Sequence, residues 1–453
     1  MGFHEWRQTH TLSVARNFYE ESMNIFKPRV DYRGSGDGVT GMEFPLVNFL
    51  IAGGYYVFGY SFIVQRVCIL MFSFLAITGI FLMAREMFQS IFWGFVSGWF
   101  LIFSPLFGYY SFVVLPDVPS LALMSLSLYY LIRWDKLDES RSFWAACFFL
   151  MIALLIKISA AIILPVWLYI FIKKRQTLTV KQILTSLTVF GAFLTLVACW
   201  YIYARYLSSL NLNYDFKLDT SFPYPLGIIP SVSKKVFIQW LPELYINYAQ
   251  FILFLIGIVT ISRSSDTNLR NLMTWFAVGV IAYMVAFYPM LEMHDYYMVT
   301  SIAFLVLLAV MGFKTLWEKA LNSKKISYVL IAICILIPIL GSIRALSRFE
   351  GARLTPHLES MEQHLNKIIP AKTELVIVAN DDSPCIYLYH MHRKGWSATD
   401  NVSIEAFTSM IKSGAHYLVS DSRKLEQRPE IEPFLEQLSE HGDFRVFKIQ
   451  PNK

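Results

Sequence analysis

Residues 4–45 read HEWRQTHTLSVARNFYEESMNIFKPRVDYRGSGDGVTGMEFP and form the one long polar run ahead of a nearly continuous series of apolar segments. The forty residues that follow this run carry only two charges, Arg66 and Arg85. A charged loop of this length next to a membrane-embedded body is suited to hold a polar headgroup at a membrane surface. We therefore expect it to supply half of an active site.

The composition indicates an integral membrane protein. Of 453 residues, 55% are hydrophobic and 16% are charged, and the mean hydropathy is +0.47, all outside the range of soluble domains. The aromatic share of 16% suits interfacial belts. The net charge of +6 is spread over basic patches beside apolar segments. We therefore attribute these charges to membrane topology and to contact with phosphate groups. No basic run is interleaved with aromatic residues in a soluble module, so no nucleic-acid partner is expected.

Cysteine spacing predicts no metal site and no disulfide framework. Four of the five cysteines lie inside apolar segments, and no CxxC or Cys/His metal spacing occurs.

Apolar runs long enough to cross a bilayer recur along the chain. The run 143–172 is interrupted by Lys157 and Pro165, which predicts two short crossings joined by a tight bend. The run 44–60 is short and contains Pro45, so we expect it to lie along the interface or to re-enter. About ten crossings are expected in all. The other runs are 62–84, 91–113, 118–132, 184–205, 248–262, 272–289, 297–313 and 327–344.

Basic loops predict the topology. By the positive-inside rule, the Lys/Arg-rich loops near 133–141, 173–181, 263–270 and 314–325 are cytoplasmic. The first loop, Asp117 and the tail from about 345 are then outside. The number of crossings agrees with these loop positions only if the run 44–60 does not cross the membrane. It also places both chain ends outside, which predicts a further transmembrane helix upstream of the sequence.

The expected fold is a mostly α, polytopic membrane protein with a small extracytoplasmic α/β domain at its C-terminus. Its parts are a first extracytoplasmic loop with an interfacial helix (1–61), a transmembrane helical bundle (62–344) and the α/β domain (345–453). In the tail, TELVIVAN, AHYLVS and FRVFKIQ are typical of strands. Helices are predicted near 356–369, 384–391, 402–413 and 431–440.

Several polar residues stand at the predicted outer surface. Asp117 in LPDVPS is either a helix N-cap or a functional carboxylate. Lys157 within an apolar run either snorkels to the interface or is paired and functional. His294 and Tyr297 in HDYY belong either to a hydrogen-bonded loop with an aromatic belt or to a site. Glu43 alone would be an ordinary loop carboxylate. Together these residues suit group transfer from a lipid phosphate, with a carboxylate taking a proton and cations stabilising the departing phosphate.

The order of these features resembles the GT-C glycosyltransferases. The shared features are a polar first loop, EFPL at 43–46, AGGYYVFG at 52–59, Arg66 at a helix start, P-D at an outside helix start, a lone lysine before a re-entrant pair, and HDYY at 294–297. The branch that includes protein O-mannosyltransferases and lipid A aminoarabinose transferase is most similar, in its bacterial members. The resemblance covers residues 1–315. It implies a GT-C-like helical bundle and transfer of a sugar from a polyprenyl-phosphate donor.

The resemblance also implies roles for individual residues. Glu43 matches the acidic residue before the proline turn, Asp117 the second outside carboxylate, and Lys157 the lysine before the re-entrant pair. One departure concerns the acidic D-E pair that the family carries about nine residues before an A-R dipeptide. Counting back from Ala15-Arg16 gives Arg7-Gln8 instead.

Glu5, Glu43 and Asp117 are therefore the candidate catalytic acids. Arg7, Lys157, His294 and Tyr297 are candidate phosphate or sugar contacts. Asp31 and Arg33 either shape the acceptor side or form a salt bridge within the loop. We expect these distant acidic and basic side chains to gather in one pocket at the outer leaflet.

The leading hypothesis is an inverting glycosyltransferase (hexosyl or pentosyl) in the cytoplasmic membrane, with its active site outside. It would use a polyprenyl-phosphate-linked sugar as donor and a lipid, glycan or protein as acceptor. No metal ligands are predicted, and a divalent cation stays open as a cofactor. A transporter or flippase of lipid-linked sugars would show inverted repeats and several buried charges, which the sequence lacks. A non-catalytic membrane scaffold is the third hypothesis.

Overall fold

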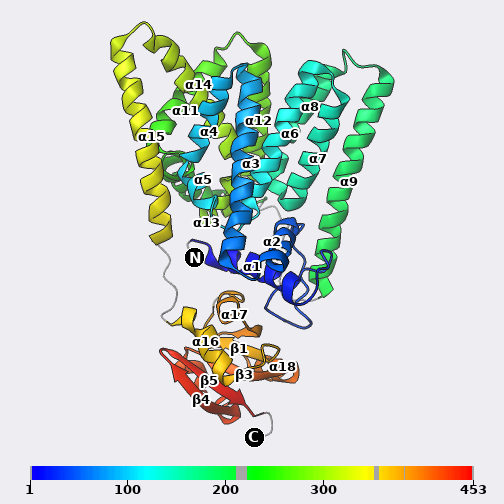
Figure 1. The fold of residues 1–453 in the computed structure, drawn as a ribbon, viewed down its shortest axis with the longest axis vertical. Coiled ribbons are helices and arrows are strands. Elements are labelled where there is room, and N and C mark those ends of the chain that lie inside the picture. The colour runs from blue at the N-terminus through cyan, green and yellow to red at the C-terminus, as the bar shows by residue number, and fades with distance from the viewer. Residues whose placement is uncertain (1–2, 211–221, 351–356, 382, 451–453) are drawn as a thin grey trace. The chain divides into compact units, whose positions relative to one another are not determined.

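The computed structural model describes residues 3–210, 222–350, 357–381 and 383–450. It divides into two compact units (Figure 1). Unit 1 comprises Met1–Val64, Tyr201–Lys217 and Glu350–Lys453, and unit 2 comprises Gln65–Trp200 and Leu218–Phe349. The first polar loop and the C-terminal tail thus fold together.

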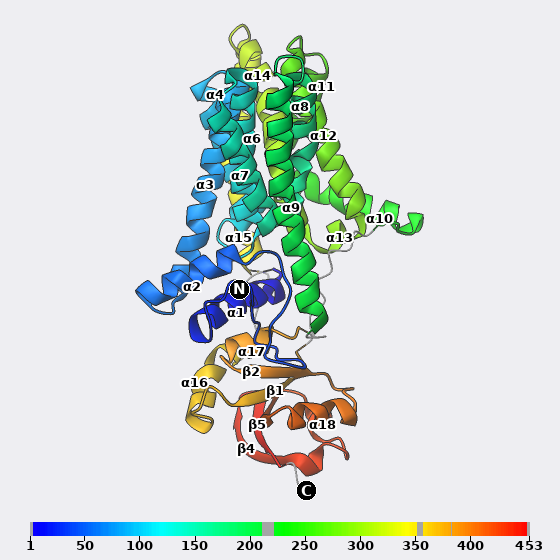
Figure 2. The same ribbon diagram turned by 90° about the vertical axis from the view of Figure 1, so that its right-hand side faces the viewer.

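Unit 2 is built from helices that run side by side (Figures 1 and 2). Short 3-10 and π-helical segments (Ile158–Ile163, Leu226–Ile228, Lys234–Tyr245 and Asp295–Met298) connect some of them. The α-helices are α3 (Phe62–Phe88), α4 (Ile91–Ile102), α5 (Pro105–Tyr110), α6 (Asp117–Leu137), α7 (Ser140–Ile156), α8 (Leu164–Lys174), α9 (Val180–Leu210), α10 (Ile229–Ser233), α11 (Tyr248–Ser262), α12 (Thr267–Ala286), α13 (Tyr288–Met293), α14 (Ile302–Ala320) and α15 (Lys324–Glu350).

The chain is a multi-pass membrane protein. Among the described residues, α3, α9, α12 and α15 are each long and apolar enough to cross a bilayer, and a bent pair of segments ending in α11 could form a fifth span. Shorter apolar helices, α2 (Leu46–Phe58), α4 and α7, accompany them. The prediction of about ten crossings counted several runs that the structure breaks into shorter helices. At about 1.5 Å per residue the 13 residues of α2 reach about 20 Å, and its interfacial placement stays a prediction.

Two of the expected spans are interrupted. The run 143–172 breaks at Lys157 into α7 and α8, as predicted. The run 91–113 was predicted as one crossing, which is wrong. It divides between α4 and α5, where Ser104 accepts a hydrogen bond from the backbone of Phe107 and Pro105 starts the new helix. Proline lacks the amide hydrogen that continuing α4 would require.

The basic loops gather at one end of unit 2. Lys136 in the last turn of α6 donates a hydrogen bond to the backbone oxygen of Glu86 at the end of α3. Lys173 at the end of α8 lies 2.6 Å from Asp135. Lys314 in α14 lies over the ring of Phe88. Helix α6 runs away from this end, so Asp117 at its start lies about 30 Å away along its axis, close to the hydrocarbon thickness of a bilayer.

Helices α11 and α14 approach each other closely at two glycines. A Cβ added at Gly257 would lie 1.9 Å from the backbone oxygen of Leu308, and one at Gly312 would lie 1.9 Å from that of Leu253. Small residues at such crossings allow the backbones of membrane helices to pack directly.

Gly312→Leu is expected to force the two helices apart and to lower the thermal midpoint of the purified protein by several degrees, because overpacking costs about 1–3 kcal/mol or more. Gly191→Leu is the matched control, since an added Cβ at Gly191 would meet nothing within 4 Å. Equal midpoints for the two variants would contradict the close crossing.

Unit 1 joins two N-terminal helices, α1 (Glu5–Glu20) and α2, to a small α/β domain (Figure 2). The domain has a five-stranded sheet in the order β2-β1-β3-β5-β4, parallel across β2-β1-β3 and antiparallel across β3-β5-β4. Its elements are α16 (Leu358–Ile368), β1 (Leu375–Ala379), α17 (Ile386–His390), β2 (Lys394–Ala398), α18 (Ile404–Lys412), β3 (Ala415–Ser420), α19 (Arg423–Glu426), β4 (Leu435–His441) and β5 (Phe444–Ile449).

The prediction for the tail is correct for three strands and three helices and wrong for one segment. The stretch 431–440 was predicted as a helix, but a short 3-10 turn at Glu432–Phe434 is followed by strand β4. Strand β4 pairs with β5 across a turn at Gly442, whose φ is +60°. Most residues of this edge strand are exposed and polar or charged, so its sequence lacks the alternation typical of a strand. The extended conformation depends on the pairing with β5. Strand β2 was not predicted.

The first loop is an extension of this sheet. Tyr32 forms a parallel bridge with Gly395 in β2. The Arg33 amide donates to the Gly395 carbonyl at 2.7 Å, and the Gly395 amide donates to the Asp31 carbonyl at 3.1 Å. The polar run that opens the sequence is therefore held by the last hundred residues.

Candidate functional site

Lys157 stands at a break between two helices of unit 2. Helix α7 ends at Ile156, and Lys157 has extended backbone angles (φ −160°, ψ 129°) before the 3-10 turn. Its amide still donates to the carbonyl of Ala153 at 2.9 Å. The break turns the lysine side chain out of the helix and into the bundle interior.

Lys157 forms a buried ion pair with Asp117, the first residue of α6. The two residues are 7% and 1% exposed. The lysine nitrogen also lies 4.6 Å from the ring centroid of Tyr296 and 5.3 Å from that of Tyr297. The snorkelling alternative for Lys157 is therefore wrong. The N-cap alternative for Asp117 is wrong too, because Pro116 holds that position and no side-chain cap bond forms.

The HDYY turn belongs to the same group of side chains. The His294 ring packs at 5.3 Å from Tyr296 and 5.7 Å from Tyr297, centroid to centroid. The sequence predicts His294, Tyr297 and Lys157 at the same outer surface but does not predict a contact among them. The structure shows the physical link, in which the tyrosine rings cover the lysine nitrogen.

A second buried network adjoins this group and was not predicted. Asp295 accepts a hydrogen bond from the Tyr110 hydroxyl at 2.6 Å and pairs with Arg348 near the end of α15. The Arg348 guanidinium lies 4.8 Å from the ring of Tyr109. Asp295 precedes Tyr296, so the network fixes the turn that covers Lys157. Only its charge within an apolar region marked Asp295 in the sequence.

Unit 1 holds Arg7 and Glu43. One guanidinium nitrogen of Arg7 donates to both Glu43 oxygens, at 2.7 and 2.8 Å. Both side chains are 15% exposed, so the pair is accessible at one edge. The neighbouring His10 is fully buried, and burial together with the charge of Arg7 lowers its pKa to about 3. A histidine with this pKa is neutral at physiological pH and accompanies the ion pair without adding charge.

Glu5 occupies the opposite face of α1. At 100° per residue, Glu5 and Arg7 point in nearly opposite directions, whereas Glu5, Arg16 and Glu20 share one face. That face contacts the α/β domain: Glu5 lies 2.9 Å from His390 Nε2, and Arg16 donates to the Tyr389 carbonyl at 2.9 Å.

Glu20 ends this face of α1 and lies 2.5 Å from His392 Nε2. Burial would raise the pKa of Glu20, but the hydrogen bond from His392 and the charge of Arg16 lower it to about 2. The acids of this face thus attach the helix to the domain.

Asp31 and Arg33 are engaged in ion pairs of the loop. Asp31 is fully buried and pairs with Arg16, while Arg33 pairs with Glu21. The salt-bridge alternative for these residues is confirmed.

Comparisons with known proteins support a common fold. Residues 43–203 match the family model of dolichyl-phosphate-mannose-protein mannosyltransferases. The chain is similar to the crystal structure of ArnT from Cupriavidus metallidurans in the apo state (TM-score 0.62, 12% identity) and bound to undecaprenyl phosphate (TM-score 0.64, 11% identity), with 98% of this chain and 93% of ArnT covered in both cases. The chain therefore has an ArnT-like GT-C fold.

A third structure extends the likeness. The oligosaccharyltransferase from Archaeoglobus fulgidus, solved as a complex with Zn and sulfate, aligns with a TM-score of 0.58 at 14% identity, over 93% of this chain and 64% of that protein. No protein of curated function matches the chain by sequence. The predicted GT-C-like fold is confirmed, and the predicted branch of the superfamily stays a prediction.

The predicted site residues form two groups in the structure. Asp117, Lys157, His294 and Tyr297 lie together in unit 2. Arg7 and Glu43 lie together in unit 1, with Glu5 on the other side of their helix. The expectation that both groups share one pocket stays a prediction.

Among the described residues, no group of three or more His, Cys, Asp or Glu side chains is placed to hold a metal ion. The buried acid Asp117 is engaged with Lys157.

Proposed function

We propose that this chain is a membrane glycosyltransferase of the GT-C superfamily. It transfers a sugar from a polyprenyl-phosphate donor to a lipid, glycan or protein acceptor on the outer face of the cytoplasmic membrane. The observation that carries the proposal is Lys157, a charged side chain at a helix break, held by Asp117 beneath two tyrosine rings. Charges at such positions in membrane proteins are expensive and usually functional.

The reaction requires one bond to form and one to break at the anomeric carbon. The acceptor hydroxyl oxygen attacks this carbon, the bond to the phosphate oxygen breaks, and the hydroxyl proton passes to a carboxylate. Attack from the face opposite the phosphate would invert the anomeric configuration. The bonding electrons leave with the phosphate, whose growing charge Lys157 and Arg7 are suited to stabilise.

Glu43 and Asp117 are the stronger candidates for the carboxylate. Glu43 is accessible and oriented by Arg7, whereas Glu5 is engaged with His390 of the α/β domain. Asp117 is paired with Lys157, which fixes the position of the lysine side chain. His294 and Tyr297 offer ring surfaces and polar atoms to a sugar beside that pair.

Charge placement supports the proposed outer location. The basic loops gather at the end of unit 2 about 30 Å from Asp117 along α6, and such loops are cytoplasmic by the positive-inside rule. The Asp117 end then opens to the outside. The structural relatives support the donor class, because one is ArnT bound to undecaprenyl phosphate.

Glu43→Gln is expected to reduce sugar transfer by about 10²–10⁴-fold, because the general base would be lost. Mass spectrometry of surface glycans and envelope lipids, at matched membrane levels of the protein, measures the effect. Asp37→Asn is the control, since Asp37 is 61% exposed and pairs with Arg29 in the same loop. If Glu43→Gln and Asp117→Asn both keep full glycan output, the enzyme proposal fails and the scaffold hypothesis replaces it.

A further inference from the structure

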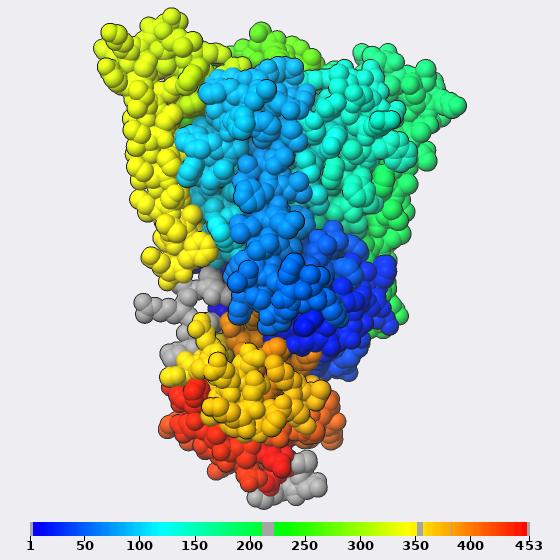
Figure 3. Space-filling view, in the orientation of Figure 1, coloured from blue at the N-terminus to red at the C-terminus, as the bar shows by residue number. Residues whose placement is uncertain are grey.

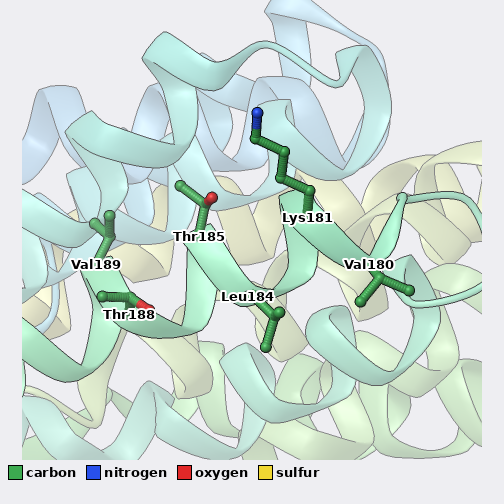
Figure 4. A pocket seen from close by; sticks show the side chains of 6 residues that line it. All are labelled: Val180, Lys181, Leu184, Thr185, Thr188 and Val189. Carbon is green, nitrogen blue, oxygen red and sulfur yellow. The ribbon is translucent and has the colours of Figure 1, made fainter.

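A groove runs beside the first turns of α9, at the end of unit 2 that carries the basic loops. One part, of about 500 Å³, is lined by Val180, Lys181, Leu184, Thr185, Thr188 and Val189 (Figure 4). An adjoining part, of about 190 Å³, shares Lys181, Thr185 and Val189 and reaches the facing ends of α6 and α7. Figure 4 shows the Lys181 and Thr185 side chains on the same side of α9, as expected for residues four apart.

Lys181 carries an uncompensated charge in this groove. The nearby carboxylates already form ion pairs with other lysines: Lys173 pairs with Asp135, and Lys174 pairs with Asp138. Within the part of the chain that the structure describes, Lys181 has no carboxylate partner. An anion bound in the groove would balance the charge of Lys181.

Hydroxyl and indole groups complete the polar end of the groove. Ser186 lines it and is 9% exposed, and in the described ranges its hydroxyl has no hydrogen-bond partner. Trp134 and Trp144 line the same part, and tryptophan is enriched at the level of lipid headgroups. A buried hydroxyl and a free ammonium together suit the oxygens of a phosphate.

Apolar side chains of α9 border the groove. Helix α9 meets its neighbours through rings, with Phe190 stacked at 4.9 Å on Trp167 and Phe193 at 6.3 Å from Trp144. Leu184 stays 59% exposed. Acyl chains along α9 would cover such a surface.

We propose that this groove binds an anionic phospholipid, with Lys181 and Ser186 contacting its phosphate and Leu184 and Val189 contacting an acyl chain. Basic pockets between membrane helices on the cytoplasmic side recognise such headgroups. The site lies one bilayer thickness from Asp117 along α6, so it is separate from the candidate catalytic group. It binds a lipid that supports α9 and is not a substrate.

The full-length protein in phosphatidylcholine nanodiscs is titrated with phosphatidylglycerol, and bound lipid is counted by native mass spectrometry together with the thermal midpoint. Wild type should retain phosphatidylglycerol and gain several degrees. Lys181→Gln should weaken retention about fivefold, the effect of one cation near a lipid surface. Lys325→Gln is the matched control, since it removes a lysine from the first turn of α15 at the same end of the bundle.

Three results would overturn the proposal. If phosphatidylglycerol is retained no better than phosphatidylcholine, the groove has no preference for an anionic headgroup. Equal losses in Lys181→Gln and Lys325→Gln would reduce the effect to net charge. Displacement of phosphatidylglycerol by equimolar polyprenyl phosphate, with Lys181→Gln impairing both, would make the carrier lipid the occupant.

Discussion

The double substitution Asp117→Asn with Lys157→Gln is expected to reduce sugar transfer by about 10²–10³-fold while the protein stays folded. The loss follows because removal of one preorganised charge that stabilises the transition state costs about this much. Folding is expected to survive because the double substitution leaves no buried charge without its partner, which is the main cost of breaking a buried ion pair. Release of polyprenyl phosphate from a lipid-linked sugar, in membranes that also supply the acceptor, measures the transfer.

The single substitutions do not separate structure from chemistry. Either one alone breaks a buried ion pair and should destabilise the protein by about 3–5 kcal/mol, so loss of activity in a single variant would be ambiguous. Asp135→Asn with Lys173→Gln is the matched control, because that pair is joined at 2.6 Å at the opposite end of unit 2. Full transfer by the Asp117/Lys157 double variant would show that the pair only supports the fold.

The sequence was sufficient for the membrane class and for most helices, because apolar runs and their interruptions are local signals. The break at Lys157 was visible for this reason. The division between α4 and α5 was also marked, by Pro105, but the surrounding apolar residues outweighed it. Strand β4 could not be recognised, since its exposed residues carry no alternating apolar pattern and its partner β5 selects the conformation.

Parts of the candidate site depend on contacts between residues distant along the chain. Asp295 and Arg348 are 53 residues apart, and Glu5 and His390 are 385 apart. No spacing rule joins such pairs, so their roles appeared only in the structure. The alternatives that the sequence left for Lys157 were decided in the same way, by the carboxylate and rings that surround its nitrogen.

Helix α1 connects the α/β domain of the tail to the Arg7–Glu43 pair. One face of the helix holds Arg7, which orients Glu43 at the start of the α2 region. The opposite face is attached to the α/β domain through Glu5, Arg16 and Glu20. The domain therefore positions Arg7 indirectly, and damage to the attachment should disturb the Arg7–Glu43 pair.

Arg16→Met is expected to destabilise unit 1 by about 3–5 kcal/mol, because it leaves Asp31 buried without its cation. Asp31 is fully buried, and Arg16 is 1% exposed with a further bond to the Tyr389 carbonyl at 2.9 Å. Amide hydrogen exchange of the full-length protein measures the effect, as faster exchange in α1 and in the tail strands while α6 and α14 of unit 2 stay unchanged.

Arg29→Met is the control for this substitution, because its partner Asp37 lies 2.9 Å away and is 61% exposed. Exposed pairs contribute about 0–1 kcal/mol, so exchange should stay near that of wild type. If Arg16→Met accelerates exchange in α1 alone, the helix is not held by the α/β domain, and the tail would have no part in positioning Arg7. If exchange rises in α1 and β2 together, the first loop and the tail unfold as one cooperative unit, which the bridge between Tyr32 and Gly395 requires.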